Sequence, residues 1–392
     1  MNDRQQFATR AVHAGESPCP ATGALDTPIY QSTTFVSANA DEMAAVYGEQ
    51  KFGYMYTRYG NPTIRALEVK MAALESGEAA LAAASGMAAI STAILGYVKA
   101  GDHVVAARSL YGAAYNFLNK KLPRMGAQAT FVPSTGIEDF EKALRPNTRL
   151  IYFETPSNPV LEIVDIAALG QLARSRGIPL MMDNTFASPF LQQPIALGVT
   201  VVVHSATKYL CGHGDAMGGM IVGPAEFIGE LLHEVIRDFG GVISPFNAWL
   251  ILRGLHTLHL RMPAHCANAQ KIAEFLAAHP RVERVNYPGL PRHRGHLVAR
   301  KQMKAFGAMI SFEARGGYEA GKKVMDRVRI FSRAASLGDT RSLIVHSAST
   351  SHRAVPRDER LAIGISDGLV RLSVGVEAVE DLIGDLDQAL AG

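Results

Sequence analysis

Residues 150–183 read LIYFETPSNPVLEIVDIAALGQLARSRGIPLMMD and contain the clearest structural unit in the chain. The stretch begins and ends with short apolar runs, Leu150–Glu154 and Leu180–Asp183, that are typical of buried strands. Between the runs, Asp165 precedes a helical pattern of apolar residues, and Gly177 stands where such a helix would end. The stretch therefore predicts a strand, a helix and a second strand that runs parallel to the first.

Similar units are predicted on both sides of this stretch. Strand-like apolar runs occur at His103–Ala107, Ala127–Val132 and Val199–His204, and helical spacing occurs at Thr63–Ser76 and Met87–Val98. Repeated βα units predict an α/β fold with a mostly parallel central sheet and helices on both of its faces. The continuous apolar character of the runs fits strands that are buried on both sides.

Changes in composition and periodicity divide the chain into three parts. Residues 1–60 are rich in Pro, Thr, Ser and aromatic residues, which predicts an extended arm with one short helix near Ala40–Tyr47. Residues 61–245 form the predicted α/β domain. Residues 246–392 form a smaller C-terminal α+β domain, which opens with a long helix over Phe246–Ala277 and closes with an amphipathic helix.

The composition excludes several classes of protein. Among 392 residues, 39 Lys and Arg stand against 36 Asp and Glu, and no stretch concentrates the basic ones, so neither a nucleic acid nor a membrane surface is an expected partner. No apolar run is long enough to span a membrane, and residues 1–6 lack the profile of a signal peptide. Three distant cysteines, Cys19, Cys211 and Cys266, argue against disulfides. A cytoplasmic protein is expected.

A lysine follows one of the predicted buried strands. Residues 201–209 read VVVHSATKY, so Lys208 stands just beyond the strand and close to the hydroxyls of Ser205 and Thr207. Proteins with parallel sheets bind ligands at the carboxyl ends of strands. Hydroxyls can hold a phosphate, and a lysine there suits Schiff-base chemistry with pyridoxal phosphate, although an isolated lysine in this place would ordinarily be a solvated side chain.

Two further features support a cofactor site. Asp183 ends another apolar strand, where a carboxylate can pair with a protonated pyridine nitrogen. Ser85-Gly86-Met87 lies between the run Ala80–Ala84 and an Ala-rich helix, where backbone N–H groups can bind phosphate. Each feature alone has a simpler explanation as a turn or a helix cap. The order of phosphate loop, aspartate and lysine within one α/β domain favours the cofactor site.

Other motifs are rejected. The glycines of Gly212–Gly218 miss the dinucleotide-binding fingerprint by one position and precede a strand, so a dehydrogenase is not expected. Cys211, His213 and Asp215 have no second cluster with zinc-like spacing, so we expect a turn and no metal. His204 lies inside an apolar strand and is expected to be a core residue.

Several motifs resemble a known family. Residues 205–209 (SATKY), followed by Gly212-His213-Gly214-Asp215, are similar to the lysine motif of the Cys/Met-metabolism enzymes that use pyridoxal phosphate, the cystathionine γ-synthase-like group of fold type I. The likeness extends along essentially the whole chain, from residues 28–34 (PIYQSTT) to residues 369–375 (LVRLSVG). It implies a fold type I pyridoxal-phosphate-dependent transferase, with residues 61–245 as the cofactor-binding domain.

The resemblance also implies which residues hold the cofactor. Lys208 would bind pyridoxal phosphate as a Schiff base and then move protons, Asp183 would face the pyridine nitrogen, and Asn158 would contact the ring hydroxyl. The cofactor phosphate would be held by Ser85, Gly86, Met87, Ser205 and Thr207. The substrate would be a small molecule, an amino acid. Tyr111 would stack on the cofactor ring and help the leaving group depart. Arg371 would clamp the substrate carboxylate, with Ser336 nearby.

The same resemblance assigns a role to the arm of residues 1–60. Tyr56 and Arg58, within residues 56–62 (YTRYGNP), are similar to residues that reach the phosphate in the neighbouring subunit. The resemblance therefore implies a homo-oligomer, a dimer of dimers whose active sites are shared between subunits.

The expected activity is γ-replacement on an O-acylated homoserine, in which sulfide gives homocysteine. Ala113 stands where methionine γ-lyases usually have a cysteine, and Ala335 where cystathionine γ-lyases usually have a glutamate. Residues 244–249 (SPFNAW) and Tyr115-Asn116 resemble O-acylhomoserine sulfhydrylases, whereas residues 261–270 resemble methionine γ-lyase.

Other activities stay open. Methionine γ-lyase, which releases 2-oxobutanoate, ammonia and methanethiol, is the main alternative, and cystathionine γ-lyase or γ-synthase activity is another. A non-enzymatic alternative is a regulatory protein that binds pyridoxal phosphate, although it would not need Lys208, Asp183, Tyr111 and Arg371 together. An aminotransferase is disfavoured, because Tyr56, Arg58 and Tyr111 occur in motifs of the γ-family.

Overall fold

A seven-stranded sheet forms the centre of the molecule. The computed structural model describes residues 5–133, 136–350, 353 and 356–391. Residues 1–4, which belong to the segment considered for a signal peptide, lie outside the described residues. The strands are β1 (Ala79–Ala83), β2 (His103–Ala107), β3 (Gln128–Val132), β4 (Thr148–Glu154), β5 (Leu180–Asp183), β6 (Val201–Ser205) and β7 (Gly219–Gly223). Their order across the sheet is β1-β7-β6-β5-β4-β2-β3.

The direction of the strands confirms the predicted mostly parallel sheet. Strands β6, β5, β4, β2 and β3 run parallel to one another, whereas β7 lies antiparallel between β6 and β1. The carboxyl ends of β4, β5 and β6 therefore meet at one edge of the sheet. The unit predicted from residues 150–183 is present as β4, helix α7 (Ile166–Ser175) and β5, with Asp165 as the N-cap of α7.

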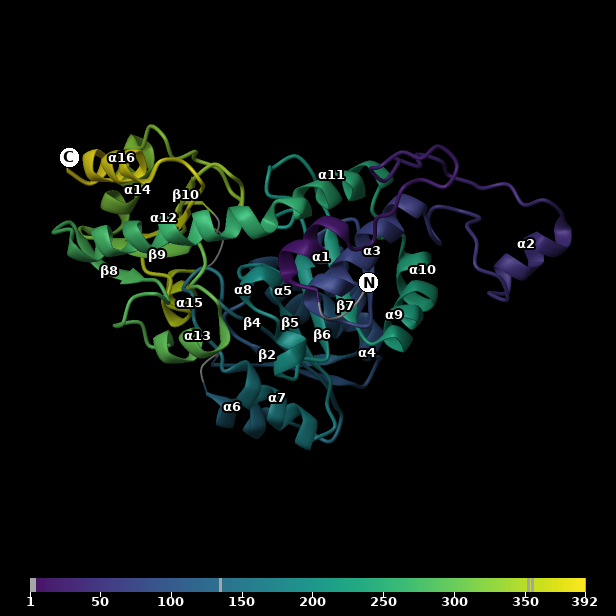
Figure 1. Ribbon diagram of the computed structural model, residues 1–392. Coiled ribbons are helices and arrows are strands. Elements are labelled where there is room, and N and C mark those ends of the chain that lie inside the picture. The colour runs from purple at the N-terminus through teal and green to yellow at the C-terminus, as the bar shows by residue number, and fades with distance from the viewer. Residues whose placement is uncertain (1–4, 134–135, 351–352, 354–355, 392) are drawn as a thin grey trace.

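Helices cover both faces of the large sheet, as predicted (Figure 1). Alternate residues of β1 and β7 enter two different cores, because successive side chains of a strand point to opposite faces. One core includes residues of α3 and α11, and the other includes residues of α4 and α7. The helices before β7 are α1 (Phe7–His13), α2 (Ala40–Tyr47), α3 (Pro62–Glu75), α4 (Gly86–Tyr97), α5 (Gly112–Asn116), α6 (Ile137–Ala143), α7 and α8 (Ser188–Leu191).

A second, smaller sheet lies in the C-terminal part of the chain. Its strands β8 (Val282–Asn286), β9 (Met309–Ala314), β10 (Leu343–His346) and β11 (Leu369–Ser373) pair antiparallel in the order β10-β11-β9-β8. The later helices are α9 (Ala225–Glu230), α10 (Arg237–Phe239), α11 (Pro245–His256), α12 (Leu258–Ala278), α13 (His296–Gln302), α14 (Gly317–Arg327), α15 (Arg357–Ala362) and α16 (Val379–Ala391). Helix α12 packs against β8 and β9, and α14 packs against β9, β10 and β11.

The prediction of one long helix over Phe246–Ala277 is wrong in one respect. The segment forms two helices, α11 and α12, which meet at Thr257. The carbonyl of Gly254 accepts a hydrogen bond from the Arg261 guanidinium at 2.8 Å. The Thr257 hydroxyl donates to the same carbonyl at 3.3 Å, and the Thr257 backbone N–H does so as well. These bonds replace the regular helical bonding of the Gly254 carbonyl and end α11 there.

The N-terminal arm contains the predicted helix α2 and also α1, which the sequence reading missed. The arm and α2 extend well beyond the large sheet on the right of Figure 1. Helix α1 buries only Phe7 and Ala11 and has no side-chain N-cap, so its sequence signal is weak. Its C-terminal carbonyls accept hydrogen bonds from the buried Lys70 ammonium, which fixes α1 against α3.

Candidate functional site

Three neighbouring strands end in residues that face one site. The register pairs Glu154 of β4 with Asp183 of β5, and Asp183 with Val203 of β6, two residues before Ser205. Because these strands are parallel, the predicted residues Asp183 and Ser205 lie at the same edge of the sheet. The burial of Asp183 raises the pKa of its carboxyl group, while the hydroxyl and backbone N–H of Thr185 oppose this effect.

The predicted phosphate loop approaches the end of β6. Ser85 caps α4, with its Oγ accepting a hydrogen bond from the Ala88 N–H at 3.1 Å. A Cβ atom at Gly86 would lie 2.7 Å from the Ser205 Cβ, so only glycine lets the start of α4 come this close. Ser85, Gly86, Met87 and Ser205 thus gather at the N-terminus of a 12-residue helix, where backbone N–H groups favour an anion.

Thr207 makes a different contact in the described structure. Its hydroxyl accepts a hydrogen bond from the Gly218 N–H at 3.1 Å and lies 3.3 Å from the Gly218 carbonyl oxygen. The next residue, Gly219, lies against the Ser85 carbonyl. Thr207 therefore lies beside the phosphate loop, and its predicted contact with the phosphate stays a prediction.

Lys208 follows β6 and reaches toward the C-terminal part of the chain. Its Nζ donates a hydrogen bond to the Ser336 Oγ at 2.8 Å. Burial and, to a lesser degree, the positive charge of Arg371 lower the pKa of the Lys208 ammonium. A lowered pKa favours the neutral amine, which is the form that acts as a nucleophile or a base.

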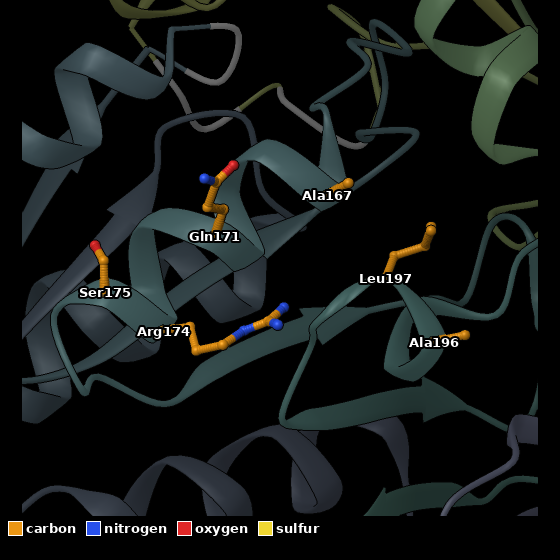
Figure 2. A pocket seen from close by; sticks show the side chains of 6 residues that line it. All are labelled: Ala167, Gln171, Arg174, Ser175, Ala196 and Leu197. Carbon is orange, nitrogen blue, oxygen red and sulfur yellow. The ribbon is translucent and has the colours of Figure 1, made fainter.

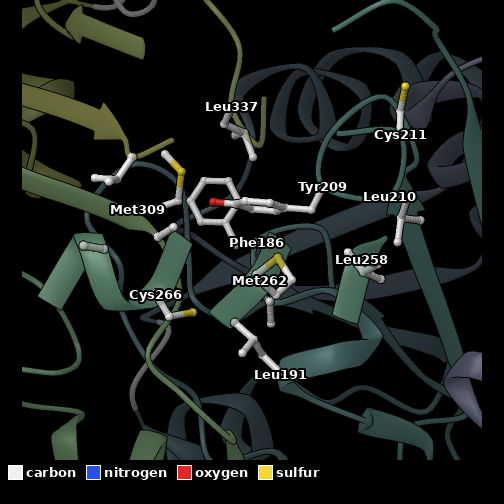
Figure 3. Close-up of a cluster of buried hydrophobic side chains, with 14 of the residues drawn as sticks. Phe186, Leu191, Tyr209, Leu210, Cys211, Leu258, Met262, Cys266, Met309 and Leu337 are labelled. Atoms are coloured by element: carbon white, nitrogen blue, oxygen red, sulfur yellow. The ribbon is translucent and has the colours of Figure 1, made fainter. Parts of the chain in front are cut away.

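A buried apolar cluster anchors the residue after Lys208. The ring of Tyr209 packs among Phe186, Met262 and Leu337, which come from segments far apart in the sequence (Figure 3). The Arg261 guanidinium donates a hydrogen bond to the Tyr209 carbonyl at 2.9 Å. The backbone that carries Lys208 is therefore held from two sides.

Arg371, on β11, links the small sheet to the large one. Its Nη1 donates to the Asn158 Oδ1 at 3.0 Å, and its Nη2 donates to the Ser336 carbonyl at 2.9 Å. Burial lowers the pKa of Arg371 to about 10, and its buried Nε has no hydrogen-bond partner within the described residues. Since the described side chains provide no carboxylate partner for Arg371, the guanidinium fits the carboxylate of a substrate.

The sequence reading missed one residue of this site, Glu154. Its Oε2 accepts a hydrogen bond from the Tyr111 N–H at 2.9 Å, and its Oε1 accepts one from the Asn158 N–H at 2.7 Å. Burial, followed by the negative charge of Asp183, raises the pKa of Glu154 to about 8. The available signal was its position at the end of a predicted strand next to the strand of Asp183.

Tyr56 and Arg58 are not brought together with the rest of the site within one chain. The Arg58 guanidinium lies 5.5 Å from the ring centre of Tyr56 and 5.2 Å from that of Tyr59. The Arg237 guanidinium lies 4.4 Å from the ring centre of Tyr59. The described ring contacts of these residues thus join the arm to the start of α10, and their reach into a neighbouring subunit stays a prediction.

The residues considered for a metal form a turn. The Cys211 Sγ donates to the Asp215 Oδ1 at 3.0 Å, and the His213 Nδ1 lies 2.8 Å from the Cys211 carbonyl oxygen. His204 is buried, as expected for a core residue, with its Nε2 2.6 Å from an oxygen of the buried Glu75 carboxyl group. These contacts give both groups of residues a structural explanation.

A shallow groove lies apart from this site, between α7 and the short helix Pro194–Leu197 (Figure 2). Its lining consists of Ala167, Gln171, Arg174, Ser175, Ala196 and Leu197. Arg174 is the one charged residue in this lining, and the predicted cofactor residues are not among the six. The groove therefore adds no chemistry to the candidate site.

The model of the Cys/Met metabolism PLP-dependent enzyme family matches residues 8–391 of the chain. The chain belongs to this family. It is therefore an enzyme of the C–S lyase type that depends on pyridoxal phosphate (PLP) and takes part in cysteine and methionine metabolism, including transsulfuration. Within the described residues, no helix is long and apolar enough to cross a membrane.

Relatives within this family carry different names. The L-methionine gamma-lyase of Fusobacterium nucleatum subsp. nucleatum is 49% identical over 386 residues, covering 98% of this chain and 98% of the relative. The O-acetyl-L-homoserine sulfhydrylase of Leptospira meyeri is 42% identical, covering 97% of this chain and 96% of the relative. The crystal structure of metY from Campylobacter jejuni, with N'-pyridoxyl-lysine-5'-monophosphate, has a TM-score of 0.96 at 34% identity and covers 99% of this chain and 100% of that chain.

The described residues fit PLP. The tight approach of Gly86 to Ser205 forms a cradle at a helix N-terminus for the phosphate. Asp183 offers a buried carboxylate to a protonated ring nitrogen, and Lys208 offers an amine of lowered pKa. When bound, PLP supplies an electron sink for the electrons of a broken bond at the α-carbon.

Proposed function

We propose that this enzyme catalyses γ-elimination from L-methionine, which with water gives methanethiol, 2-oxobutanoate and ammonia. The observation that carries the proposal is the position of Lys208 and Arg371 around Ser336. Lys208 bonds to the Ser336 hydroxyl and Arg371 to the Ser336 carbonyl. An amino acid whose carboxylate is held by Arg371 thus brings its α-carbon close to the Lys208 amine.

Three side chains would divide the chemistry. The neutral amine of Lys208, favoured by burial and by Arg371, accepts the α-proton and later moves a proton to the substrate chain. Arg371 grips the substrate carboxylate through its planar guanidinium. Tyr111, which is about half exposed and close enough to Arg371 to act on its charge, covers the reacting carbon atoms and donates a proton to the thiolate that leaves.

The choice of methionine is supported by likeness to the Fusobacterium L-methionine gamma-lyase, which at 49% identity is nearer than the Leptospira sulfhydrylase at 42%. A specific observation favours a second candidate, sulfide addition to an O-acylated homoserine. Ala113, at the start of α5, occupies the place where methionine γ-lyases usually have a cysteine. Both reactions use Lys208, Tyr111 and Arg371, so these residues do not separate them.

The arm supports a shared site in a homo-oligomer, which we propose to be a dimer of dimers. Apolar side chains of the arm are strongly exposed in the single chain, including Leu25 at 79%, Val36 at 101% and Phe52 at 78%. A second subunit that covers them would remove this surface from water and bring Tyr56 and Arg58 to a neighbouring cofactor phosphate. The division at residues 60 and 245 is part of the same proposal. The two sheets, which lie on either side of residue 245, support the second of these boundaries.

A product assay on the PLP-loaded enzyme tests this proposal. Separate reactions receive methionine alone, sulfide with O-acetylhomoserine, and sulfide with O-succinylhomoserine, and each is repeated with the Lys208→Ala variant. We expect fast release of 2-oxobutanoate from methionine. If homocysteine forms much faster than 2-oxobutanoate, the enzyme is a sulfhydrylase instead, and the faster of the two sulfide reactions identifies its acyl donor.

A further inference from the structure

The carboxyl group of Glu154 is placed to fix two site residues at once. Glu154 is the last residue of β4, and its side chain is buried. One oxygen accepts the Tyr111 N–H and the other accepts the Asn158 N–H, at 2.9 Å and 2.7 Å. Tyr111 precedes α5 and Asn158 lies in the loop after β4, so a single carboxyl group joins two separate segments.

We infer that Glu154 is a positioning residue, which holds Tyr111 and Asn158 at the cofactor ring through their backbone N–H groups. The inference rests on the proposed function of the site, because the role of Tyr111 belongs to it, and on the ring contact that the family resemblance implies for Asn158. Asn158 in turn accepts a hydrogen bond from Arg371. Glu154 therefore connects the residue that would cover the ring with the residue that would hold the substrate carboxylate.

The geometry explains why a carboxyl group is needed at this position. Two N–H groups point at two oxygens, and both oxygens of a carboxyl group can accept a hydrogen bond whether or not the group is protonated. A glutamine has one oxygen and one NH₂ group, so one of the two backbone donors would face another donor. Tyr111 or Asn158 would then shift, and a displacement of about 1 Å in a catalytic group can cost on the order of 100-fold in rate.

The chain offers a matched control in Asp385 of α16. This buried carboxylate also accepts backbone N–H groups, from Arg329, Ile330 and Phe331 at 2.7 to 3.1 Å. Its contacts lie outside the candidate site. A variant of Asp385 therefore reports what the loss of a buried carboxylate does to stability alone.

The test compares Glu154→Gln with Asp385→Asn as PLP-loaded enzymes. We expect Glu154→Gln to change the visible circular dichroism of the bound cofactor and to lower kcat by about tenfold or more, with a smaller change in KM. Asp385→Asn should lower the melting temperature and leave the visible spectrum as in the wild type. The spectrum requires no substrate, so it tests Glu154 even if methionine proves not to be the substrate.

A double-mutant comparison with Tyr111→Ala separates positioning from a general loss of structure. If Glu154 acts through Tyr111, the fold-loss in kcat of the double variant is smaller than the product of the fold-losses of the two single variants. For Asp385→Asn combined with Tyr111→Ala, the fold-losses in kcat should multiply. If Glu154→Gln does not fold, Glu154→Asp keeps the carboxyl group but shortens the reach, and the same measurements apply. An unchanged cofactor spectrum and kcat, or losses that multiply as in the control, would overturn the inference.

Discussion

Lys208 occupies a partly buried position near a second cation, and both features favour its neutral amine. Burial is the larger cause of its lowered pKa, and the charge of Arg371 is the smaller one. The one described side-chain hydrogen bond of Lys208 goes to the Ser336 hydroxyl. The amine is thus available as a nucleophile or a base.

Lys208→Ala should abolish turnover and leave a folded protein. Loss of the proton-transferring amine is expected to lower kcat by at least about 10²–10⁴-fold, and loss of the covalent link to the cofactor lowers it further. The melting temperature should change little. Assays of kcat, together with far-ultraviolet circular dichroism, check both parts, and Lys271→Ala, which removes an exposed lysine paired with Glu380, serves as the control. Full activity of Lys208→Ala would contradict the proposed mechanism.

The raised pKa of Glu154 predicts how pH affects the stability of the cofactor-free protein. In the folded protein this pKa is about 8, against an ordinary value of 4.5, so between these pH values the folded state binds more protons than the unfolded state. The free energy of unfolding from this group therefore falls as pH rises, by up to about 1.4 kcal/mol per pH unit. Urea unfolding should show that the free energy of unfolding of the wild type, minus that of Glu154→Gln, becomes smaller as the pH rises toward 8. A difference that grows with pH would contradict the raised pKa.

At the scale of elements, local patterns were sufficient where a strand or helix is determined by its own residues. Strands β2 and β5 and helix α2 have the predicted bounds, because each is a continuous apolar run or a capped helix. The break at Thr257 was not predictable, since the apolar pattern continues through it and the cause is the Arg261 side chain bonding to the Gly254 carbonyl. Helix α1 was missed because Lys70, 58 and 59 residues away from its partners, fixes its end.

The site follows the same rule. Asp183 and Lys208 were recognisable because each stands at the end of a strand of its own, where α/β proteins place functional groups. Glu154 stands in an equivalent place, yet its role depends on backbone N–H groups, one of them 43 residues away. Backbone donors have no residue-type signature, so a sequence pattern could not reveal this contact.

Gly86→Ala tests the contact between the start of α4 and the end of β6. The new Cβ would lie 2.7 Å from the Ser205 Cβ, so α4 or β6 must move. We expect overpacking to cost about 1–3 kcal/mol of stability and to weaken PLP binding at the same time. Gly384→Ala in α16 is the control, because a Cβ there meets open space and should stabilise the helix by about 0.5–1 kcal/mol. Unchanged PLP affinity in Gly86→Ala would show that the cofactor phosphate does not bind at the start of α4.

At the scale of the whole molecule, the proposed function divides the site between two chains. Within the chain, Lys208 and Arg371 both donate hydrogen bonds to Ser336, and Arg371 also donates one to Asn158. Arg58 instead lies with Tyr56 and Tyr59 in the arm. A complete site would therefore need the arm of a second subunit, and this dependence can be measured without a structure of the oligomer.

Mixed oligomers of two inactive subunits provide that measurement. A Lys208→Ala subunit keeps an arm with an intact Arg58. An Arg58→Ala subunit, which should retain PLP poorly, keeps an intact Lys208. If sites are shared within dimers, random pairing leaves about a quarter of the sites with both residues intact, so activity at limiting PLP should return to about that fraction of wild type. Lys208→Ala mixed with Asp183→Asn should recover nothing, because both residues belong to the same chain's part of the site. Confirmed hybrids of the first pair that stay inactive would assign Arg58 to its own chain or to no site.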